Sequence, residues 1–402
     1  MALTGVKDTG AITEPAGFTA AGVFTGVKRM GPDLGLVVSD RPAVVAGRFT
    51  SHRMPAAPVS YTREVVARGR AQAIVANSGS ANAATGRAGL EDAREMGRAA
   101  ARALGIEPEL VAVASTGVVG SRLPMDRILP GIERAARERS RQGGAMAAKA
   151  ILTTDSHPKE VVRRVSVRGR TLTWGGMAKG SGMIHPNLAT MLCFVTTDAG
   201  LHPEVLDAML GRAVADTLNL VTVDGDQSTN DMVLALANGA QGVHLAPGDP
   251  ELEVVEAALA EVLQELAYGL VEDGEGATRV LRVRVRGAAS VEDARRAART
   301  IAGSQLVKAA VYGGDPNWGR VYVALGNAGV PVDPLAVTIR VGDVVLMEAG
   351  EVVAYNEAEA RFAMMGTEVR FAVDMGAGPG SAEALGCDLT EAYVVINSKY
   401  RT

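Results

Sequence analysis

Val280-Leu-Arg-Val-Arg-Val-Arg286 alternates apolar and charged residues, and a stripe of apolar residues at helical spacing follows at 290–302. A period of two is the signature of a half-buried strand, and a period of 3.6 is that of a helix that lies on a sheet. Strand-type and helix-type runs interleave in the same way along the rest of the chain. The sequence therefore predicts α/β layers, rather than a helical bundle or a sandwich of sheets alone.

The other predicted strands are short runs rich in valine, leucine and alanine. They lie at 34–39, 73–77, 110–114, 161–167, 191–197, 321–325, 336–341, 368–373 and 392–396. The other predicted helices lie at 88–104, 131–142, 206–214 and 252–270. At 402 residues the chain is expected to hold two or more domains, although no low-complexity linker marks a boundary.

Composition narrows the class of protein. Lys and Arg number 41 against 45 Asp and Glu, and no long basic block stands out, so we expect no nucleic-acid partner. No apolar run reaches the roughly 18 residues that span a bilayer. The first residues show no secretion signal either, so we expect a cytoplasmic protein. Cys193 and Cys387 form no ligand spacing with the five histidines, so we expect no metal site.

A second stretch carries the candidate chemistry, and it reads Gly175-Gly-Met-Ala-Lys-Gly-Ser-Gly-Met-Ile-His-Pro-Asn-Leu-Ala-Thr-Met-Leu192. Glycine-rich backbone can cradle a phosphate, but the spacing Gly-x-x-x-x-Gly-Lys-Ser/Thr is absent and no helix clearly follows. The alternative is a long hairpin connection that runs into the next strand. The residues by themselves leave both a nucleotide-binding loop and a hairpin connection open.

Residues 177–192 closely resemble the self-cleavage segment of the ornithine acetyltransferase family, also called the glutamate N-acetyltransferase family. Further stretches match the same family in the same order and span essentially the whole chain. They are Ala114–Gly120, Thr153–Asp155, Val223–Asp231, Glu272–Arg279, Gly314–Arg320 and Asn397–Thr402. Each stretch is a weak signal alone, whereas the ordered set is specific.

The resemblance implies that the chain cuts itself between Ala189 and Thr190 into an α chain, 1–189, and a β chain, 190–402. Thr190 Oγ would attack the carbonyl of Ala189, and water would hydrolyse the resulting ester. The new N-terminal threonine carries a hydroxyl nucleophile and also an α-amine, whose ordinary pKa of about 7.7–8.0 suits a base near neutral pH. The implied fold has helix–sheet–sheet–helix layers, and the paired chains form an α2β2 or larger assembly.

The implied reaction belongs to arginine biosynthesis. It moves acetyl from N2-acetylornithine to glutamate through an acetyl-Thr190 ester in ping-pong order, and it yields ornithine and N-acetylglutamate. Such a cycle needs neither a metal nor an organic cofactor. Some family members also accept acetyl-coenzyme A (acetyl-CoA) as donor, and the sequence does not decide this point.

Two parts of the implied site stabilise charge. Thr116 and Gly117 match the family's oxyanion pair, which must be in place when the attacked acetyl carbonyl becomes an oxyanion. Lys179 matches a substrate-binding lysine that could pair with a carboxylate. Judged by residues alone, the first pair is a turn after a strand and the lysine is a surface residue.

Four further residues match the family's substrate site. Glu275 could hold the donor's ammonium group, although Glu272 lies in the same acidic turn. Thr153 could exchange hydrogen bonds with the substrate, or it could simply cap a turn. Asn397 and Thr402 belong to a C-terminal tail that must be tied down to take part, since chain ends are disordered by default.

Other features have simpler explanations. Val223–Asp231 alternates acidic residues like a calcium loop, but it lacks the glycine and the glutamate that such a loop needs, so we interpret it as a structural turn near the site. His185 lies five residues before Thr190, and the N-terminal amine makes a histidine base unnecessary. Three rival functions remain: a self-cleaving N-terminal-threonine aminopeptidase or amidase, a nucleotide-binding protein, and a non-catalytic homologue.

Overall fold

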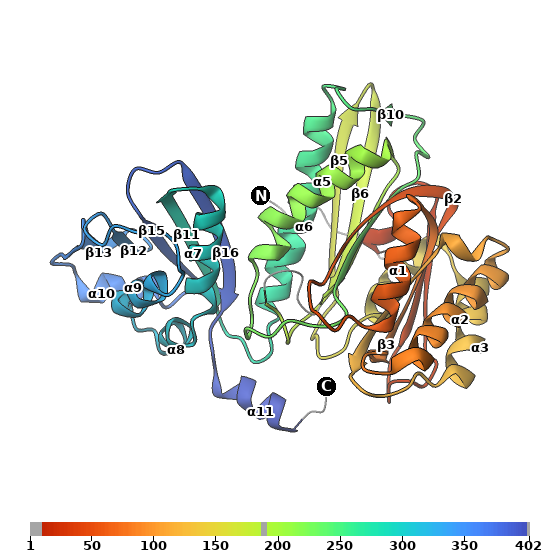
Figure 1. Cartoon of the computed structure of the whole chain (residues 1–402), viewed down its shortest axis with the longest axis horizontal. Helices are drawn as coiled ribbons and strands as arrows, with labels where there is room; N and C mark the ends of the chain where they lie inside the picture. The colour runs from red at the N-terminus through yellow and green to blue at the C-terminus, as the bar shows by residue number, and fades with distance from the viewer. Residues whose placement is uncertain (1–9, 186–190, 400–402) are drawn as a thin grey trace.

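The fold was analysed in a computed structural model, which describes residues 10–185 and 191–399. Two units lie side by side and are joined through the strand that follows α6 (Figure 1). The larger unit contains an eight-stranded sheet, and the smaller one contains a six-stranded sheet. Among the described residues, no helix is long and apolar enough to cross a membrane.

The large sheet has the order β4-β3-β2-β9-β7-β6-β5, with β1 paired to β2. Its strands are β1 Phe18–Val23, β2 Leu34–Phe49, β3 Arg70–Ser80, β4 Val111–Val118, β5 Lys159–Val167, β6 Arg170–Lys179, β7 Leu192–Thr197 and β9 Met232–Ala237. The long strand β2 pairs with β1 in its first half and with β9 in its second half, and β3 pairs with it on both sides of the shift, at 34–38 and at 43–44. A register shift between Val38 and Ala43 separates the two halves, so β2 joins two layers of one sheet.

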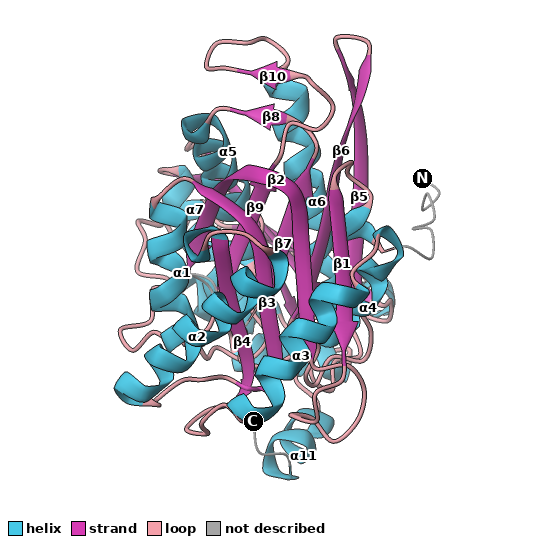
Figure 2. Cartoon of the chain, turned by 90° about the vertical axis from the view of Figure 1, so that its right-hand side faces the viewer, coloured by secondary structure: helices cyan, strands magenta, loops and turns pink. Residues whose placement is uncertain are grey.

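The helices of the large unit cover both outer faces of this sheet. They are α1 Ala57–Ala67, α2 Gly86–Leu104, α3 Met125–Glu138, α4 Gly144–Ala150, α5 Pro203–Asp216 and α6 Leu252–Glu272. Short pieces complete the unit: η1 Ala11–Thr13, η2 Pro108–Leu110, η3 Arg141–Gly143, η4 Leu218–Leu220, β8 Gly200–Leu201 and β10 His244–Leu245. Figure 2 looks onto the α2–α3 layer, with the strands behind it.

Successive buried side chains along the central strands belong to different cores, as the layers require. In β9, Leu234 packs in a middle core and Val233 packs under α5 and α6. In β3, Ile74 belongs to the same middle core, whereas Val75 packs under α2 and α3. Successive side chains of a strand face opposite sides, so the two sheet halves face each other across the middle core. The expected helix–sheet–sheet–helix layers are therefore confirmed, with both sheet layers belonging to one hydrogen-bonded sheet.

The smaller unit has the strand order β14-β13-β12-β15-β11-β16 and one helical layer. Its strands are β11 Val280–Ala288, β12 Thr338–Val341, β13 Val344–Glu348, β14 Glu351–Val352, β15 Glu368–Asp374 and β16 Gly380–Cys387. Its helices are α7 Val291–Gly303, α8 Gln305–Gly313, α9 Trp318–Gly326 and α10 Glu357–Ala363. The last helix, α11 Glu391–Lys399, leaves this unit and lies below the junction with the large unit (Figure 1).

Two predicted strands are wrong. Residues 321–325 lie inside α9, which begins where Asn317 Oδ1 accepts the N–H of Arg320 and which buries Val321, Ala324 and Leu325 on one face. Residues 392–396 lie inside α11, where Thr390 Oγ1 accepts the N–H of Tyr393. In both segments a capping side chain stabilises the helix start and outweighs the β propensity of valine and isoleucine.

The glycine-rich stretch is a hairpin connection and not a phosphate loop. Gly175–Lys179 is the end of β6, which pairs antiparallel with β7 from Trp174–Thr197 to Lys179–Leu192. Its glycines serve packing, because a Cβ on Gly175 would lie only 2.0 Å from the carbonyl oxygen of Ala11. The nucleotide-binding alternative loses its structural basis.

Candidate active site

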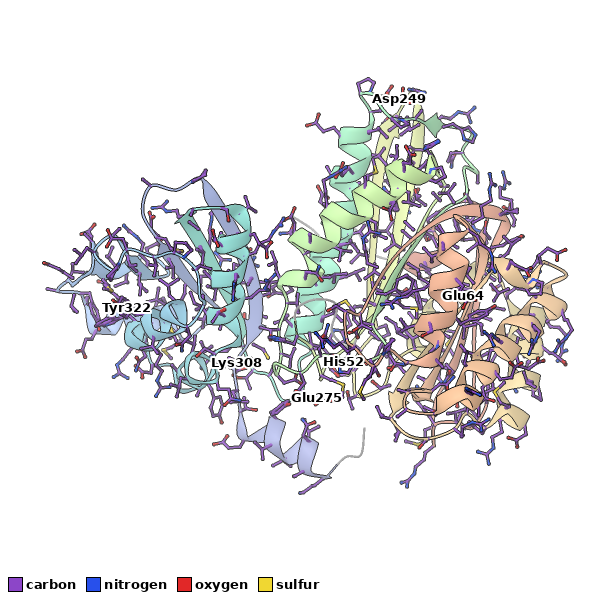
Figure 3. The ribbon with its side chains drawn as sticks, in the orientation of Figure 1. His52, Glu64, Asp249, Glu275, Lys308 and Tyr322 are labelled. Atoms are coloured by element: carbon purple, nitrogen blue, oxygen red, sulfur yellow. The ribbon has the colours of Figure 1, made fainter. Side chains whose placement is uncertain are left out.

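A cavity of about 300 Å³ opens where the large unit, the turn after α6 and helix α11 meet. It receives residues from eight separate stretches of the chain, and Glu275 marks its place near α11 in Figure 3. The residues that line it are Lys28, Gly79, Ala81, Thr116, Gly117, Val118, Val119, Thr153, Thr154, Lys179, Gly182, Met183, Asp224, Asp226, Gln227, Ser228, Thr229, Asn230, Glu275, Tyr393 and Asn397. Six residues predicted for the site are thus brought together.

Thr116 and Gly117 lie at the end of β4, at the cavity wall. Gly117 has a φ of 129°, and a Cβ on it would lie 2.4 Å from the carbonyl carbon of Gly79, so only glycine fits this close strand pairing. Asn230 fixes the opposite loop against this strand by donating to the carbonyls of Ser115 and Ala81. The pair therefore sits in a rigid frame, as preorganised oxyanion donors require.

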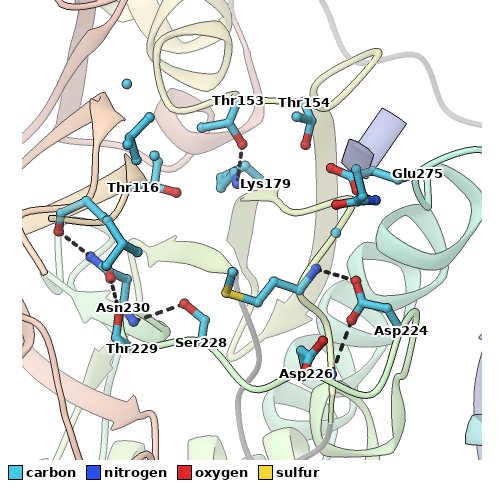
Figure 4. A pocket seen from close by; sticks show the side chains of 18 of the residues that line it. Thr116, Thr153, Thr154, Lys179, Asp224, Asp226, Ser228, Thr229, Asn230 and Glu275 are labelled. Atoms are coloured by element: carbon cyan, nitrogen blue, oxygen red, sulfur yellow. Dashed lines mark hydrogen bonds between the residues drawn. The ribbon is translucent and has the colours of Figure 1, made fainter. Parts of the chain in front are cut away.

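Lys179 is fully buried, and its ammonium group donates to Thr153 Oγ1 over 2.7 Å (Figure 4). Asp155 lies behind this pair, 3.8 Å from Lys179 Nζ, and accepts from Lys159 Nζ at 2.6 Å and from the N–H of Gly180 at 2.6 Å. Burial alone would raise the pKa of Asp155, but the charges of Lys179 and Lys159 and these hydrogen bonds outweigh burial and hold that pKa well below its usual range. Burial in turn lowers the pKa of Lys179 against the attraction of Asp155.

Replacing Asp155 by Asn should lower the free energy of unfolding by about 3–5 kcal/mol, because the buried Lys179 would lose its carboxylate partner and Lys159 would keep only Asp273. Urea denaturation at neutral pH measures this loss. The folded-state pKa is depressed, so the stabilisation is complete above the ordinary Asp pKa of about 3.9 and fades as the pH falls below it. The exposed pair of Asp40 and Arg41 supplies the control, since Asp40→Asn should change little. Equal stability of both variants would contradict the assigned role.

Glu275 lies on the acidic side of the cavity, across from Thr116 (Figure 4). Its carboxylate accepts from Asn397 Nδ2 at 2.9 Å, and its N–H donates to the carbonyl of Ser181. A Cβ on Gly182 would lie 2.4 Å from this carboxyl group, so glycine permits the close approach. Glu272, the alternative in the same turn, is exposed at the end of α6 and does not line the cavity.

The loop at 223–231 is a wall of the cavity, as the structural interpretation predicts. Asp224 accepts from the N–H groups of Met183 and Ile184 and from Tyr393 Oη. It thereby ties the connection after β6 to helix α11. Asp226 lines the cavity beside it with an exposed side chain.

The expected scissile pair, Ala189 and Thr190, and the tail residue Thr402 lie outside the described residues. The next residue, Met191, is buried, and its N–H donates to Asp231 Oδ1 at 2.9 Å. Asp231 is adjacent in sequence to Asn230 of the cavity wall, and burial raises its pKa. Met191 is therefore held by a residue that directly follows the cavity-wall residue Asn230.

His185 and the two cysteines lie outside the cavity lining. His185 is half-buried, lies 3.3 Å from Thr222 Oγ1 and does not line the cavity. Cys193 and Cys387 are free and buried. Within the ranges 10–185 and 191–399, no group of three or more His, Cys, Asp or Glu side chains could hold a metal ion.

Sequence reasoning missed Lys28 and Tyr393 as cavity residues. Tyr393 lies four residues before Asn397, so it occupies the same helix face, and recognising α11 as a helix would have found it. Lys28 lies in the loop between β1 and β2, and its position depends on the buried carboxylate of Asp33 that holds this loop.

The fold and the site together define a layered α/β protein with a cavity of amino-acid size that has cationic and anionic sides. Residues 19–402 match the model of the ArgJ family. The arginine biosynthesis bifunctional protein ArgJ of Symbiobacterium thermophilum is 52% identical over 98% of this chain and 99% of that protein. The protein of the same name from Caldanaerobacter subterraneus is 46% identical over 98% and 99%. The chain belongs to the ArgJ family.

A solved structure agrees with this assignment. The crystal structure of the arginine biosynthesis bifunctional protein argJ from Bacillus halodurans is 40% identical, with a TM-score of 0.50. The match covers 52% of this chain and 98% of that one. The solved chain of this relative is therefore about half as long as the present chain.

Proposed function

We propose that the protein is an acetyltransferase of arginine biosynthesis that moves acetyl from N2-acetylornithine to glutamate. The observation that carries the proposal is the cavity itself, in which Thr116, Gly117, Lys179, Glu275 and Asn397 meet. A donor with an α-carboxylate at one end and an ammonium group at the other matches a cavity with lysines on one side and carboxylates on the other. The ArgJ names of the relatives fit the same pathway.

The nucleophile in this proposal is Thr190, freed by self-cleavage after Ala189. Its hydroxyl oxygen attacks the Ala189 carbonyl, and the peptide C–N bond breaks to free the α-amine of Thr190. Water then hydrolyses the ester, which releases the Ala189 carboxylate and restores the threonine hydroxyl. Two features support the cut: Met191 is bonded to Asp231, which directly follows the cavity-wall residue Asn230, and a relative was solved as a chain of half length. Strands from both sides of the cut, β6 and β7 among them, pair in one sheet, so the α and β chains should stay associated.

Transfer then proceeds in two steps. The Thr190 amine takes the proton of its own hydroxyl, the oxygen attacks the acetyl carbonyl, and ornithine leaves with that proton on its α-amine. Glutamate's neutral α-amine attacks the acetyl-threonine ester, and N-acetylglutamate leaves as the hydroxyl is restored. Thr116 and Gly117 stabilise the oxyanion in both steps, and the buried surroundings strengthen their hydrogen bonds.

Three finer points belong to the same proposal. The enzyme works in the cytoplasm, and its αβ units pair into an α2β2 or larger assembly. Acetyl-CoA serves as a second donor, in keeping with the word bifunctional in the names of the relatives. One test distinguishes this transferase from an amidase that uses the same threonine after self-cleavage. The transferase releases ornithine only when glutamate is present.

Helix α11 should be needed for donor binding. Asn397 donates to Glu275 and so holds the carboxylate that receives the substrate ammonium. Asn397→Ala removes this hydrogen bond and should raise the KM for N2-acetylornithine about tenfold. Steady-state kinetics measures this change. Ser398→Ala, which removes an exposed hydroxyl of the same helix, is the matched control. Removal of residues 397–402 without any change in the Michaelis constants would contradict the role of the tail.

A further inference from the structure

Lys28 is a cation on the cavity wall that the proposed mechanism does not use. Its side chain is half-buried, and Nζ donates to the carbonyl of Leu152 at 2.9 Å. Among the residues that the structure describes, no carboxylate lies within ion-pair distance of it; burial lowers its pKa, and the more distant charges of Asp33 and Asp155 oppose that effect. A partly desolvated cation without a counter-charge is suited to binding an anion.

The backbone before Lys28 is built around a single buried carboxylate. Asp33 is fully buried, and it accepts five hydrogen bonds, from Thr25 N–H and Oγ1 and from the N–H groups of Gly26, Val27 and Lys28. Each of these bonds to a charged acceptor is stronger than a neutral one. The loop that presents Lys28 is therefore held in one conformation.

This loop places Lys28 on the side of the cavity where the acetyl group reacts. A Cβ on Gly79 would lie 3.0 Å from Lys28 Cγ, and Gly79 pairs with Gly117 across β3 and β4. Leu152, which accepts the Lys28 ammonium, precedes Thr153 of the cavity wall. Lys28 thus contacts both the strand pair that carries Gly117 and the segment that carries Thr153.

The chemistry of the substrates requires a cation on this side. In N2-acetylornithine the carboxylate and the acetylated nitrogen share the α-carbon, whereas three methylene groups separate the ammonium from it. When the acetyl carbonyl faces Thr116 and Gly117, the carboxylate must lie close by and the ammonium must reach toward Glu275. Lys179 is available on this side, but Asp155 lies 3.8 Å from it and offsets its charge.

We infer that Lys28 binds the α-carboxylate that the donor and the acceptor amino acids share, beside Lys179. This inference rests on the proposed function, because it takes its ligand from the same reaction. Lys28 is then a binding residue common to both half-reactions, whereas Glu275 serves the side-chain end of the donor. Loss of Lys28 should weaken the binding of all three ligands: N2-acetylornithine, ornithine and glutamate.

The test measures binding of ornithine and of putrescine, which is ornithine without its carboxylate, by titration calorimetry. The proteins are the parent, Lys28→Met and Arg29→Met, where Arg29 is an exposed neighbouring cation that does not line the cavity. Lys28→Met should weaken the binding of ornithine about tenfold to a hundredfold, because a hydrogen-bonded charge contact is lost. It should leave the binding of putrescine unchanged. Arg29→Met should bind both ligands as the parent does. Self-cleavage of each variant, seen on a denaturing gel, checks that it folds.

Each outcome of these titrations either supports or overturns the role of Lys28 in carboxylate binding. Equal weakening of both ligands by Lys28→Met, unchanged binding of ornithine, or an equal effect of Arg29→Met would overturn the inference while the transferase proposal stands. Lys28→Arg supplies a second check, since it keeps the charge and should recover part of the ornithine affinity. A parent that binds neither ligand and transfers no acetyl would overturn the proposed function, and the inference with it.

Discussion

Thr190→Ala should leave the protein as one uncut chain and lower acetyl transfer by about 10^4-fold or more, since it removes the only atom that attacks in both the cut and the transfer. Thr190→Ser should still cut and transfer, at a lower rate, because it keeps a hydroxyl in the same position. Denaturing gels taken over time after expression measure the cut, and ornithine release in the presence of glutamate measures transfer.

The control for this variant is His185→Ala. His185 is the histidine nearest to the proposed cut in sequence, and it lies outside the cavity lining, so its loss should leave both the cut and the transfer near the parent level. The opposite pattern, with cleavage in Thr190→Ala and none in His185→Ala, would replace the N-terminal-threonine mechanism by a histidine-assisted one.

Gly117→Ala should lower kcat by about a hundredfold or more, because it displaces a donor of the oxyanion hole. The added Cβ would meet the carbonyl carbon of Gly79 at 2.4 Å, so β4 must shift away from β3 at the point where the acetyl oxyanion forms. The self-cleavage step passes through a similar oxyanion, so the cut should slow as well. Thr116→Val, which removes only the hydroxyl, tests the pair without the backbone clash.

Gly120 provides the matched control for this prediction. It also has a positive φ, 84°, but nothing lies within 4 Å of a Cβ built on it. Gly120→Ala therefore carries backbone strain of about 1–2 kcal/mol without moving the strand pair, and kcat should stay near the parent value. Equal loss of kcat in both variants would show that strain, and not the position of the oxyanion donors, controls the rate.

The α/β layers could be predicted from the sequence because burial in strands such as β11 alternates, here from Leu281 to Arg286. The helix over Val321–Leu325 could not, since valine and tyrosine favour strands, and the cap from Asn317 that decides the matter is a single hydrogen bond. That both predicted sheet layers belong to one hydrogen-bonded sheet also escaped prediction. It depends on the register shift within β2, which only the pairing partners on each side define.

The candidate site, like the fold, could be predicted only in part from the sequence. Thr116, Lys179, Glu275 and Asn397 could be named from ordered motifs, and the fold brings them to one cavity. Lys28 could not be named, because its place depends on Asp33, whose carboxylate holds the loop between the paired strands β1 and β2. Choosing Glu275 over Glu272 likewise needed the end of α6, which turns one carboxylate inward and leaves the other exposed.

The most direct test of the central claim is intact-mass analysis of the denatured protein, before and after incubation with N2-acetylornithine. The account predicts two fragments that meet at Ala189 and Thr190, with one acetyl group gained by the fragment that begins at Thr190 and lost again when glutamate is added. A single uncut chain, or an acetyl group that glutamate does not remove, would contradict it.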